Sequence, residues 1–417
     1  MKLSLPIRRL RPPFIRSIPY RLLVFSFCAL CVLCGRSSSQ DFKTLKPGIE
    51  YAEVTKEISG LKVNINLLRL DLRKVRLDVH HAMDAAIGTE KTSSIATRHG
   101  AFAAINAGFF RLDTSIWAGD PAGLLMVNGD LLSESIKDRE SLIVLNGDAR
   151  ETHLLFGHYQ SKAWIQFGEK TWGSFFELSG INRERKASEA VLYNGSVFKK
   201  LIMSSGNVEL RLNKCKALPF LNSSDAEKRC EDVEIIEDGA TPKLKNPQLV
   251  VFLDKEFASA NSIQEKIKAF KTLVTKTIIV RTRIKDGNIF PFTAANVDIT
   301  NGIPQLIKNG KIDITWQEEK SSKSFVETRH PRTAVAKLKD GKFLMITVDG
   351  RTESSGGIGL QDLAECLLSL GATDAMNLDG GGSTTMFVDG KVVNHPSDKE
   401  GERKVSDAIL VIPRKKK

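Results

Sequence analysis

Short apolar runs recur along this chain, and many of them end at an Asn-Gly or Asp-Gly pair. Both residues of such a pair accept a positive φ, which the tight two-residue turn of a β-hairpin requires. The pattern therefore predicts a strand-rich protein with several tight hairpins. The six pairs are Asn128–Gly129, Asn146–Gly147, Asn194–Gly195, Asn309–Gly310, Asp340–Gly341 and Asp389–Gly390.

Helical periodicity occurs in few places. After Leu360 the apolar residues recur every three or four positions, which makes one helical face, and Gly371 stands where a C-terminal cap belongs. We predict two further helices, over Ser262–Val274 and Ser93–His99. A few packed helices together with strand-rich mixed sheets indicate an α+β fold.

One large domain is expected over residues 45–413, because the chain shows neither an internal repeat nor a long linker. From about 205 to 290 the pattern loosens into charged stretches, which we interpret as a surface insertion. Residues 414–417 form a basic tail.

The N-terminal segment has a composition of its own. A basic stretch up to Arg21 is followed by 14 uncharged, mostly apolar residues, Leu22–Gly35, and then by small polar residues. This order is typical of an export signal, and the run is short for a membrane-spanning helix. We predict that residues 1–36 are a cleaved signal peptide; a retained anchor, or lipid attachment at Cys34, stays open. The expected location is periplasmic, cell-envelope or extracellular.

The formal net charge of +12 comes mainly from the two ends of the chain. Residues 1–36 hold seven basic residues and no acidic one, and residues 414–417 are all basic. The domain between them is close to neutral, whereas a nucleic-acid binder needs a clustered basic face. We expect no nucleic-acid partner, and membrane attachment only through the N-terminal segment.

Three cysteines lie in the predicted domain. Cys215 and Cys230 could close a loop in an oxidising compartment, and their pairing stays open. Cys366 lies in an apolar helical stretch and is predicted to be a buried thiol.

A metal site is weighed at His80–His81 with Asp84. Alternation along a strand would direct the two histidines to opposite faces, and no Cys/His metal pattern occurs in the predicted domain. We predict no metal ligands and no cofactor.

Three consecutive glycines follow Asp379 in "NLDGGGSTTMFVDG". The run "ATDAMNL" before them predicts a buried strand and "TTMFV" predicts the next one, so Asp379–Ser383 connects two strands. Glycines let backbone N–H groups converge as a small anion-binding nest, and the following hydroxyls add donors. No Gly-Lys-Ser/Thr follows, so this is not a phosphate-binding P-loop. A purely structural turn is the alternative.

Two other strand ends carry polar side chains. "RHPRTAVA" places Arg332 and Thr333 at the start of an apolar strand, and "MITVDGR" ends a strand with Asp349 and Arg351. Polar residues at strand ends often converge on one rim of a sheet, and the arginine fork suits a phosphate or a carboxylate. We expect both carboxylates, both guanidiniums and the glycine connection to meet there. Structural Arg–Asp salt bridges are the alternative.

A buried amide is expected upstream. In "AFAAINAGFF" Asn106 is the only polar side chain of an apparent buried strand. Because a buried amide must be hydrogen-bonded, it would orient a catalytic group or a substrate hydroxyl. A turn-capping asparagine is the alternative.

Together these stretches resemble the phosphodiester glycosidase family. The matching pieces run in order across the predicted domain, and only the part from about 205 to 290 matches loosely. They are "AAINAGFF", "GINRERKASEAVLYN", "NGIPQLIKNGK", "RHPRTAVA", "ITVDGR", "GGIGLQDLAECLLSLGATDAMNLDGGGSTTMFVDG" and "NHPSD". The family's shared polar positions correspond here to Asn106, Arg332, Thr333, Asp349, Arg351, Asn377, Asp379, Gly380, Gly381, Gly382 and Ser383.

The resemblance implies hydrolysis of the sugar–phosphate link of a glycosyl phosphodiester, which releases free sugar and leaves a phosphate monoester. A phosphate monoester leaves readily, since its second pKa is about 6. We expect four catalytic residues, Asp379, Asp349, Asn106 and Arg332. Arg332 and the glycines would hold phosphate, and Asp379 or Asp349 would act as nucleophile or base. Asn106 and Asn377 would orient sugar or carboxylate. The remaining shared positions, Thr333, Arg351, Asn377, Gly380, Gly381, Gly382 and Ser383, are expected to bind substrate.

The expected substrate is a phosphate-containing glycan of the envelope or the extracellular space, such as an exopolysaccharide. Two alternatives stay open. One is a non-catalytic, polysaccharide-binding envelope protein. The other is a metal-assisted phosphodiesterase with Asp349, Asp379 and His330 as ligands.

Overall fold

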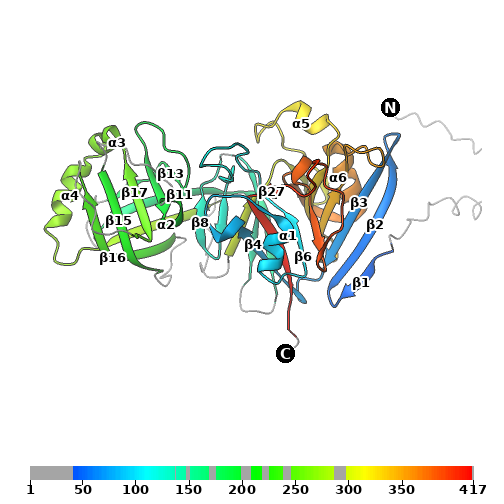
Figure 1. Cartoon of the computed structure of the whole chain (residues 1–417), viewed down its shortest axis with the longest axis horizontal. Coiled ribbons are helices and arrows are strands. Elements are labelled where there is room, and N and C mark those ends of the chain that lie inside the picture. The colour runs from blue at the N-terminus through cyan, green and yellow to red at the C-terminus, as the bar shows by residue number, and fades with distance from the viewer. Residues whose placement is uncertain are drawn as a thin grey trace, which may run out of the picture. The chain divides into compact units, whose positions relative to one another are not determined.

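Antiparallel β-sheets account for most of the computed structural model, which is coloured along the chain in Figure 1. The structure describes residues 41–136, 138–146, 151–168, 175–198, 208–217, 225–237, 246–285 and 297–415. The predicted signal peptide, residues 1–36, lies outside the described residues. Contacts group Phe42–Lys417 into one unit. Within the described residues, no helix combines the length and apolar character that crossing a membrane would require.

The first sheet, sheet I, has eight strands and is buried on both faces near its centre. Its central strands are therefore almost continuously apolar instead of alternating. In order across the sheet the strands are β1 (Lys43–Lys46), β2 (Ile49–Ile58), β3 (Leu61–Leu70), β23 (Phe343–Val348), β22 (Arg332–Leu338), β24 (Ala372–Asn377), β20 (Gln305–Lys308) and β21 (Lys311–Ile312).

Sheet II has five strands and shares an apolar core with one face of sheet I. This core includes Met345 and Met376 from sheet I and Ile105 and Ile409 from sheet II. The strands of sheet II, in order, are β26 (Lys391–Val392), β25 (Met386–Val388), β6 (Ala103–Asn106), β28 (Asp407–Pro413) and β4 (Val75–His81). Because β24 and β25 belong to different sheets, the glycine connection between them passes from sheet I to sheet II.

Helix α6 (Leu360–Ser369) covers the other face of sheet I. Its apolar face, with Leu363 and Leu367, packs against residues such as Ala334 and Ile346. The remaining short elements are α1 (Thr92–Arg98), α2 (Gly195–Phe198), α5 (Lys323–Glu327), η1 (Ala82–Asp84), η2 (Gly381–Ser383) and the paired strands β5 (Glu90–Lys91) and β27 (Lys404–Val405).

Two further sheets follow. Sheet III comprises β10 (His153–His158), β9 (Glu140–Leu145), β19 (Val297–Asn301), β7 (Leu125–Val127) and β8 (Asp130–Ser133). Sheet IV comprises β12 (Phe175–Glu177), β11 (Gln160–Phe167), β18 (Ile278–Lys285), β16 (Asp225–Ile236), β15 (Val208–Ala217), β17 (Leu249–Leu253), β14 (Ala190–Asn194) and β13 (Gly180–Ile181).

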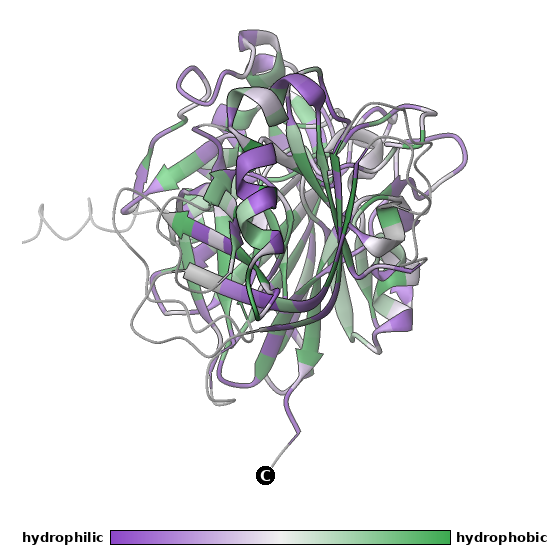
Figure 2. Cartoon of the chain, turned by 90° about the vertical axis from the view of Figure 1, so that its left-hand side faces the viewer, coloured by the Kyte–Doolittle hydropathy of each residue, from purple (hydrophilic) through white to green (hydrophobic). Residues whose placement is uncertain are grey.

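Sheet IV has its own apolar core, completed by α3 (Lys255–Ala260) and α4 (Ile263–Lys271). In Figure 2 the helices show purple and green residues side by side, as expected of helices that cover a sheet on one face only. The stretch expected to be a loose surface insertion is thus, where described, largely regular sheet. A disulfide joins the directly opposed Cys215 of β15 and Cys230 of β16.

The α+β expectation holds only loosely, because sheets dominate and the helices are few and short. Cys366 is a buried thiol, as predicted. Four of the predicted hairpins are confirmed: β7–β8, β20–β21, β22–β23 and β25–β26. Strands β9 and β10 also pair, but Gly147 between them lies outside the described residues.

The prediction of a hairpin at Asn194–Gly195 is wrong. Helix α2 begins at Gly195, and the side chain of Asn194 accepts a hydrogen bond from the backbone N–H of Val197. Asparagine caps a helix start as readily as it turns a hairpin, so the pair alone did not distinguish the two.

Candidate active site

The glycine connection brings three distant segments together. The N–H of Asp379 donates to the Ala107 carbonyl at 3.0 Å, directly after β6. The N–H of Gly381 donates to the Pro331 carbonyl at 2.9 Å, directly before β22. These bonds place Asp379 between the end of a sheet II strand and the start of a sheet I strand.

Asn106 is the fully buried centre of this junction. Its Nδ2 donates to the Asp379 carbonyl at 2.7 Å. Its Oδ1 accepts from the Thr333 hydroxyl at 2.8 Å and from the Thr385 N–H at 3.0 Å. The amide therefore fixes the backbone on both sides of the glycines. The Thr333 hydroxyl acts through Asn106, and the Thr333 carbonyl accepts the Leu378 N–H at 2.8 Å.

Asp379 is partly buried, and its Oδ1 accepts the Gly380 N–H at 2.9 Å. Burial raises the pKa of its carboxyl to about 6, despite the opposing effects of the Ser383 hydroxyl and the Arg403 charge. The nearby Asp407 carboxylate also raises this pKa. A carboxyl with such a pKa changes protonation close to neutral pH, as a general base or nucleophile does.

The three glycines are needed for close approach. A Cβ on Gly380 would lie 2.8 Å from the Pro331 carbonyl oxygen, and one on Gly382 would overlap the Asp398–Arg403 ion pair. Gly381 has a φ of 61° and lies against the Arg351 guanidinium. The N–H groups of Gly380 and Gly381 are already donated within the protein. The glycine connection therefore offers an anion fewer backbone N–H donors than the sequence indicated.

Asp349 follows β23 and is 1% exposed. Its Oδ1 accepts from the His395 N–H at 3.0 Å and lies 3.4 Å from Asn394 Nδ2, while its Oδ2 lies 3.3 Å from His395 Nδ1. Burial raises the pKa of the Asp349 carboxyl above its ordinary value, although these contacts oppose the shift. Asn394 Nδ2 also donates to the Thr384 carbonyl, which links Asp349 to the glycine connection.

Two arginines near the loop carry charge that no carboxylate neutralises among the described residues. Arg332, 1% exposed, donates from Nη2 to the carbonyls of Phe325 and Thr328 and from Nε to that of Ile358. Its Nη1 forms no hydrogen bond with a described residue. Burial, helped by the Arg351 charge, lowers the pKa of Arg332 to about 10.

Arg351 is exposed, and its Nη2 lies 3.3 Å from His330 Nδ1. Burial first, then the charges of Arg332 and Arg351, lowers the pKa of His330. Like charges facing one another without a counter-ion create a local field that favours an anion. Arg332 and Arg351 therefore make a cationic rim beside Gly380 and Gly381, and His330, whose lowered pKa leaves it uncharged near neutral pH, lies next to Arg351.

Asn377 ends β24 and is fully buried. Its Nδ2 donates to the carbonyls of Ile303 and Leu378, whereas its Oδ1 finds no partner among the described residues. The buried hydroxyls of Thr384 and Thr385 and the amide of Asn301 are likewise unpaired there. Unpaired buried polar atoms are rare in folded proteins, and several of those among the described residues lie at this junction.

Sequence analysis missed Asp407 and Arg403. Asp407 begins β28 and accepts from the Gly108 N–H at 3.1 Å and the Thr300 hydroxyl at 2.7 Å. The reasoning that selected Asp349, a carboxylate beside a buried apolar run, would have found Asp407 as well. Arg403 had no such signal, because it lies in a polar loop.

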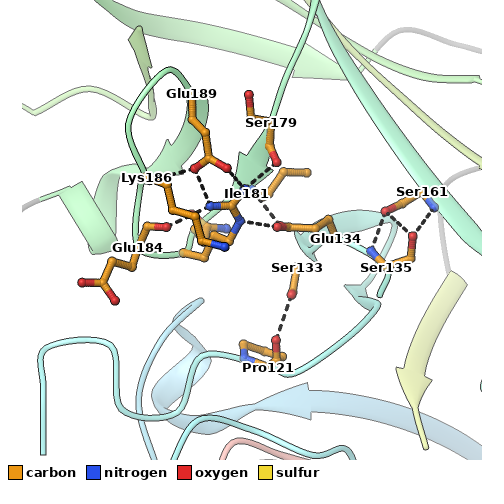
Figure 3. Close-up of polar contacts among 12 residues, drawn as sticks. Pro121, Ser133, Glu134, Ser135, Ser161, Ser179, Ile181, Glu184, Lys186 and Glu189 are labelled. Carbon is orange, nitrogen blue, oxygen red and sulfur yellow. Dashed lines mark hydrogen bonds and ion pairs between the residues drawn. The ribbon is translucent and has the colours of Figure 1, made fainter. Parts of the chain in front are cut away.

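The motif piece "GINRERK" does not meet Asp379 directly. Arg183 lies between Glu134, at 2.5 Å, and Glu189, at 2.7 Å. In Figure 3 Glu134, which follows β8, also accepts the Ile181 N–H, and Ser133 donates to the Pro121 carbonyl. This network ties sheet IV to sheet III and to the loop that follows Asn106.

The ligand set considered for a metal-assisted phosphodiesterase is not assembled. His330 lies beside the arginines, whereas Asp349 faces Asn394 and His395. Among the described residues, Asp349, Asp379 and His330 do not form a group with metal-ligand spacing. His80 and His81 have separate surroundings, since His81 is buried against the carbonyls of Ala82 and Gly119.

Comparison with known proteins gives a resemblance to a family and a shared fold. The family model described as phosphodiester glycosidase matches residues 233–412. Bovine N-acetylglucosamine-1-phosphodiester alpha-N-acetylglucosaminidase is 34% identical over 161 residues, which are 36% of this chain and 29% of that protein. The human enzyme is 30% identical over 185 residues, 41% of this chain and 35% of that protein. The chain thus spans about a third of the length of these curated relatives.

A solved structure of a hypothetical protein from Synechocystis superposes with a TM-score of 0.65 at 21% identity. The match covers 91% of this chain and 65% of that one. At this identity the likeness shows a shared fold alone. The sequence matches confirm the family resemblance that the motifs indicated.

Proposed function

We propose that this chain, which resembles the phosphodiester glycosidases over residues 233–412, hydrolyses the sugar–phosphate bond of a glycosyl phosphodiester. The products are a free sugar and a phosphate monoester. The observation that supports this most is the cationic rim, which has no carboxylate partner among the described residues. It lies against the glycines that directly follow Asp379, whose carboxyl has a pKa of about 6.

The cationic rim is suited to the phosphate. Arg351 is exposed, and the Nη1 of Arg332 has no hydrogen-bond partner among the described residues, so both can donate to phosphate oxygens. Arg332 also holds the carbonyls of Phe325 and Thr328 in place. We therefore assign Arg351 mainly to binding and Arg332 to both binding and positioning.

Asp379 is suited to the sugar side of the bond. Above pH 6 its carboxylate is ionised. It either takes a proton from the water that attacks the anomeric carbon, or attacks that carbon itself and forms a glycosyl ester that water then hydrolyses to free sugar. The bond from that carbon to the phosphate oxygen breaks, and its electron pair leaves with the phosphate. Asp349 is a weaker candidate for this role, because both of its oxygens already face His395.

The substrate we propose is a phosphate-linked glycan of the cell envelope or the extracellular space, met after export through the N-terminal segment. The carbohydrate itself is left to experiment. Asn106 and Asn377 are assigned as positioning residues, since both are fully buried and hold the backbone around Asp379.

The test is to incubate the purified chain with a panel of glycosyl-1-phosphodiesters and to identify the products by mass spectrometry. We expect free sugar and a phosphate monoester in equal amounts. Sugar phosphate as the product would contradict the proposal. Saturable binding of polysaccharide without any turnover would support the non-catalytic alternative instead.

A further inference from the structure

A second polar cluster lies where β4 ends, on residues that the proposed hydrolysis does not use. His80 Nδ1 is 3.8 Å from Asp84 Oδ1, and His99 Nε2 is 2.8 Å from the same oxygen. The two imidazole rings stack, with their centroids 3.6 Å apart. Two histidines and a carboxylate from three adjoining elements, β4, η1 and the end of α1, thus face one another.

We propose that His80, Asp84 and His99 bind a divalent transition-metal ion of the zinc class. One ligand atom from each residue lies within 4.8 Å of the others. A tetrahedral ion with bonds of about 2.1 Å would hold its ligand atoms roughly 3.4 Å apart, so only small side-chain movements are needed. Imidazole nitrogen together with a carboxylate oxygen is a donor set that zinc accepts well.

A cavity of about 350 Å³ opens onto this cluster. All three residues line it, together with Asn128, Asp130 and Asn194 among others. Three protein ligands beside an open cavity leave a fourth coordination position for water or a small ligand. The surroundings therefore match an accessible metal centre better than a closed structural one.

The backbone directs Asp84 toward the histidines. Met83 and Asp84 have backbone φ values of 57° and 50°. Residues other than glycine rarely adopt this left-handed conformation. The Met83 N–H donates to Glu90 Oε2 at 2.7 Å, which holds this turn.

Arg98 is the cation that now contacts the carboxylate. Its Nη1 contacts Asp84 Oδ2 and lies 3.0 Å from His99 Nε2, while its Nη2 binds Glu90 Oε2 at 2.7 Å. A metal ion would displace Arg98 from Asp84 and His99 but leave its bond to Glu90. Arg98 is thus a built-in competitor that weakens metal binding.

This proposal differs from the metal site considered from sequence. That site paired His80 with the adjacent His81, which the structure buries against the carbonyls of Ala82 and Gly119. The second imidazole is instead His99, nineteen positions after His80. The proposal is also independent of hydrolysis, because its test measures metal binding alone.

The test is a zinc titration of the full chain in competition with a chromophoric chelator. We expect one equivalent of Zn²⁺ to bind, and His80→Ala and His99→Ala each to weaken its affinity at least about tenfold. His153→Ala, which removes an exposed histidine on β10, is the matched control and should bind as the parent does. Absence of binding by the parent, or equal binding by all variants, would overturn the proposal.

Two further measurements test the site even if the alanine variants do not fold. Anomalous diffraction at the zinc edge, on crystals of the parent chain grown with Zn²⁺, should place the ion between His80 and His99; an ion elsewhere would refute the site. Arg98→Gln should bind Zn²⁺ more tightly than the parent. Unchanged or weaker binding would show that Arg98 is not a competitor.

Discussion

The junction of sheets I and II differs from sheet IV in where polar groups lie. At the junction, Asn106, Thr333, Asp349 and Arg332 are at most 1% exposed. In sheet IV the core cluster is apolar, and most ion pairs, such as Lys162–Glu177, lie at the surface, although β15 also buries the Arg211–Glu209 pair. Burying polar groups costs free energy unless they are hydrogen-bonded, so a protein concentrates them where they serve a purpose. The comparison assigns chemistry to the junction and structural support to sheet IV.

The largest effect is expected from Asp379→Asn. This change removes the ionisable group but keeps the shape of the side chain, so kcat should fall by about 10³-fold while the melting temperature stays close to that of the parent. Steady-state kinetics and thermal unfolding measure the two. The matched control is Asp389→Asn, the same change in the exposed β25–β26 turn, which should leave kcat unaltered. Near-parental activity of the Asp379 variant would break the assignment.

Asn106→Ala should destabilise the junction as a whole. It removes three hydrogen bonds and leaves buried groups unpaired, so the free energy of unfolding should fall by about 2–4 kcal/mol. Denaturant titration measures this loss. Thr333→Val removes only one of the three bonds and should cost about 1 kcal/mol. Equal losses for both variants would mean that Asn106 does not organise the loop.

Removing the Cys215–Cys230 disulfide tests whether sheet IV only supports the structure. For a sequence separation of 15 residues, loop-closure entropy predicts a loss of about 3 kcal/mol of stability in the double serine variant. Because sheet IV is assigned to support, kcat at a temperature where the variant is folded should equal the parental value. A large drop in kcat without unfolding would give sheet IV a direct part in the reaction.

Arg351→Ala should weaken substrate binding more than it affects turnover. The exposed guanidinium binds phosphate in both the ground and transition states, so KM should rise about 10-fold with kcat changed much less. Arg73→Ala, an exposed arginine paired with Asp71, is the control. A fall in kcat at constant KM would instead place Arg351 in transition-state stabilisation.

A further effect concerns pH. Burial raises the pKa of Asp379 from 3.8 to about 6, so this group stabilises the fold fully below pH 4 and that contribution is lost as the pH rises through 6. The ionised form is the reactive one, so kcat/KM should fall below pH 6. Comparing unfolding of the parent and Asp379→Asn at pH 4 and pH 7 isolates the stability change. An identical pH dependence in both would contradict the assignment.

Strand ends and turns were predictable from sequence because they depend on local patterns. The apolar runs before Asp349 and around Asn106 identified β23 and β6, and the glycines identified the connection after β24. Cross-sheet neighbours were not predictable. Nothing local in the sequence shows that Asp407 faces Gly108, that Arg403 packs on Gly382, or that His99 stacks on His80.

The core of sheet IV was also not predictable from the sequence. Its strands β15 and β16 are rich in charged residues, some of them buried as the Arg211–Glu209 pair is, and this composition was interpreted as a surface insertion. Their pairing buries Leu210, Leu212 and Cys230 in a core that becomes visible only when the strands are aligned. Long antiparallel strands with many charged residues are therefore easily mistaken for irregular surface segments when only composition is considered.

The central claim is that the bond broken lies between the sugar carbon and oxygen, beside Asp379, and not between phosphorus and oxygen. Hydrolysis of a glycosyl phosphodiester in ¹⁸O-labelled water separates the two, because both routes can release free sugar and a phosphate monoester. We predict that the label appears in the sugar and that the phosphate monoester remains unlabelled. Label in the phosphate would show attack at phosphorus and would contradict the account.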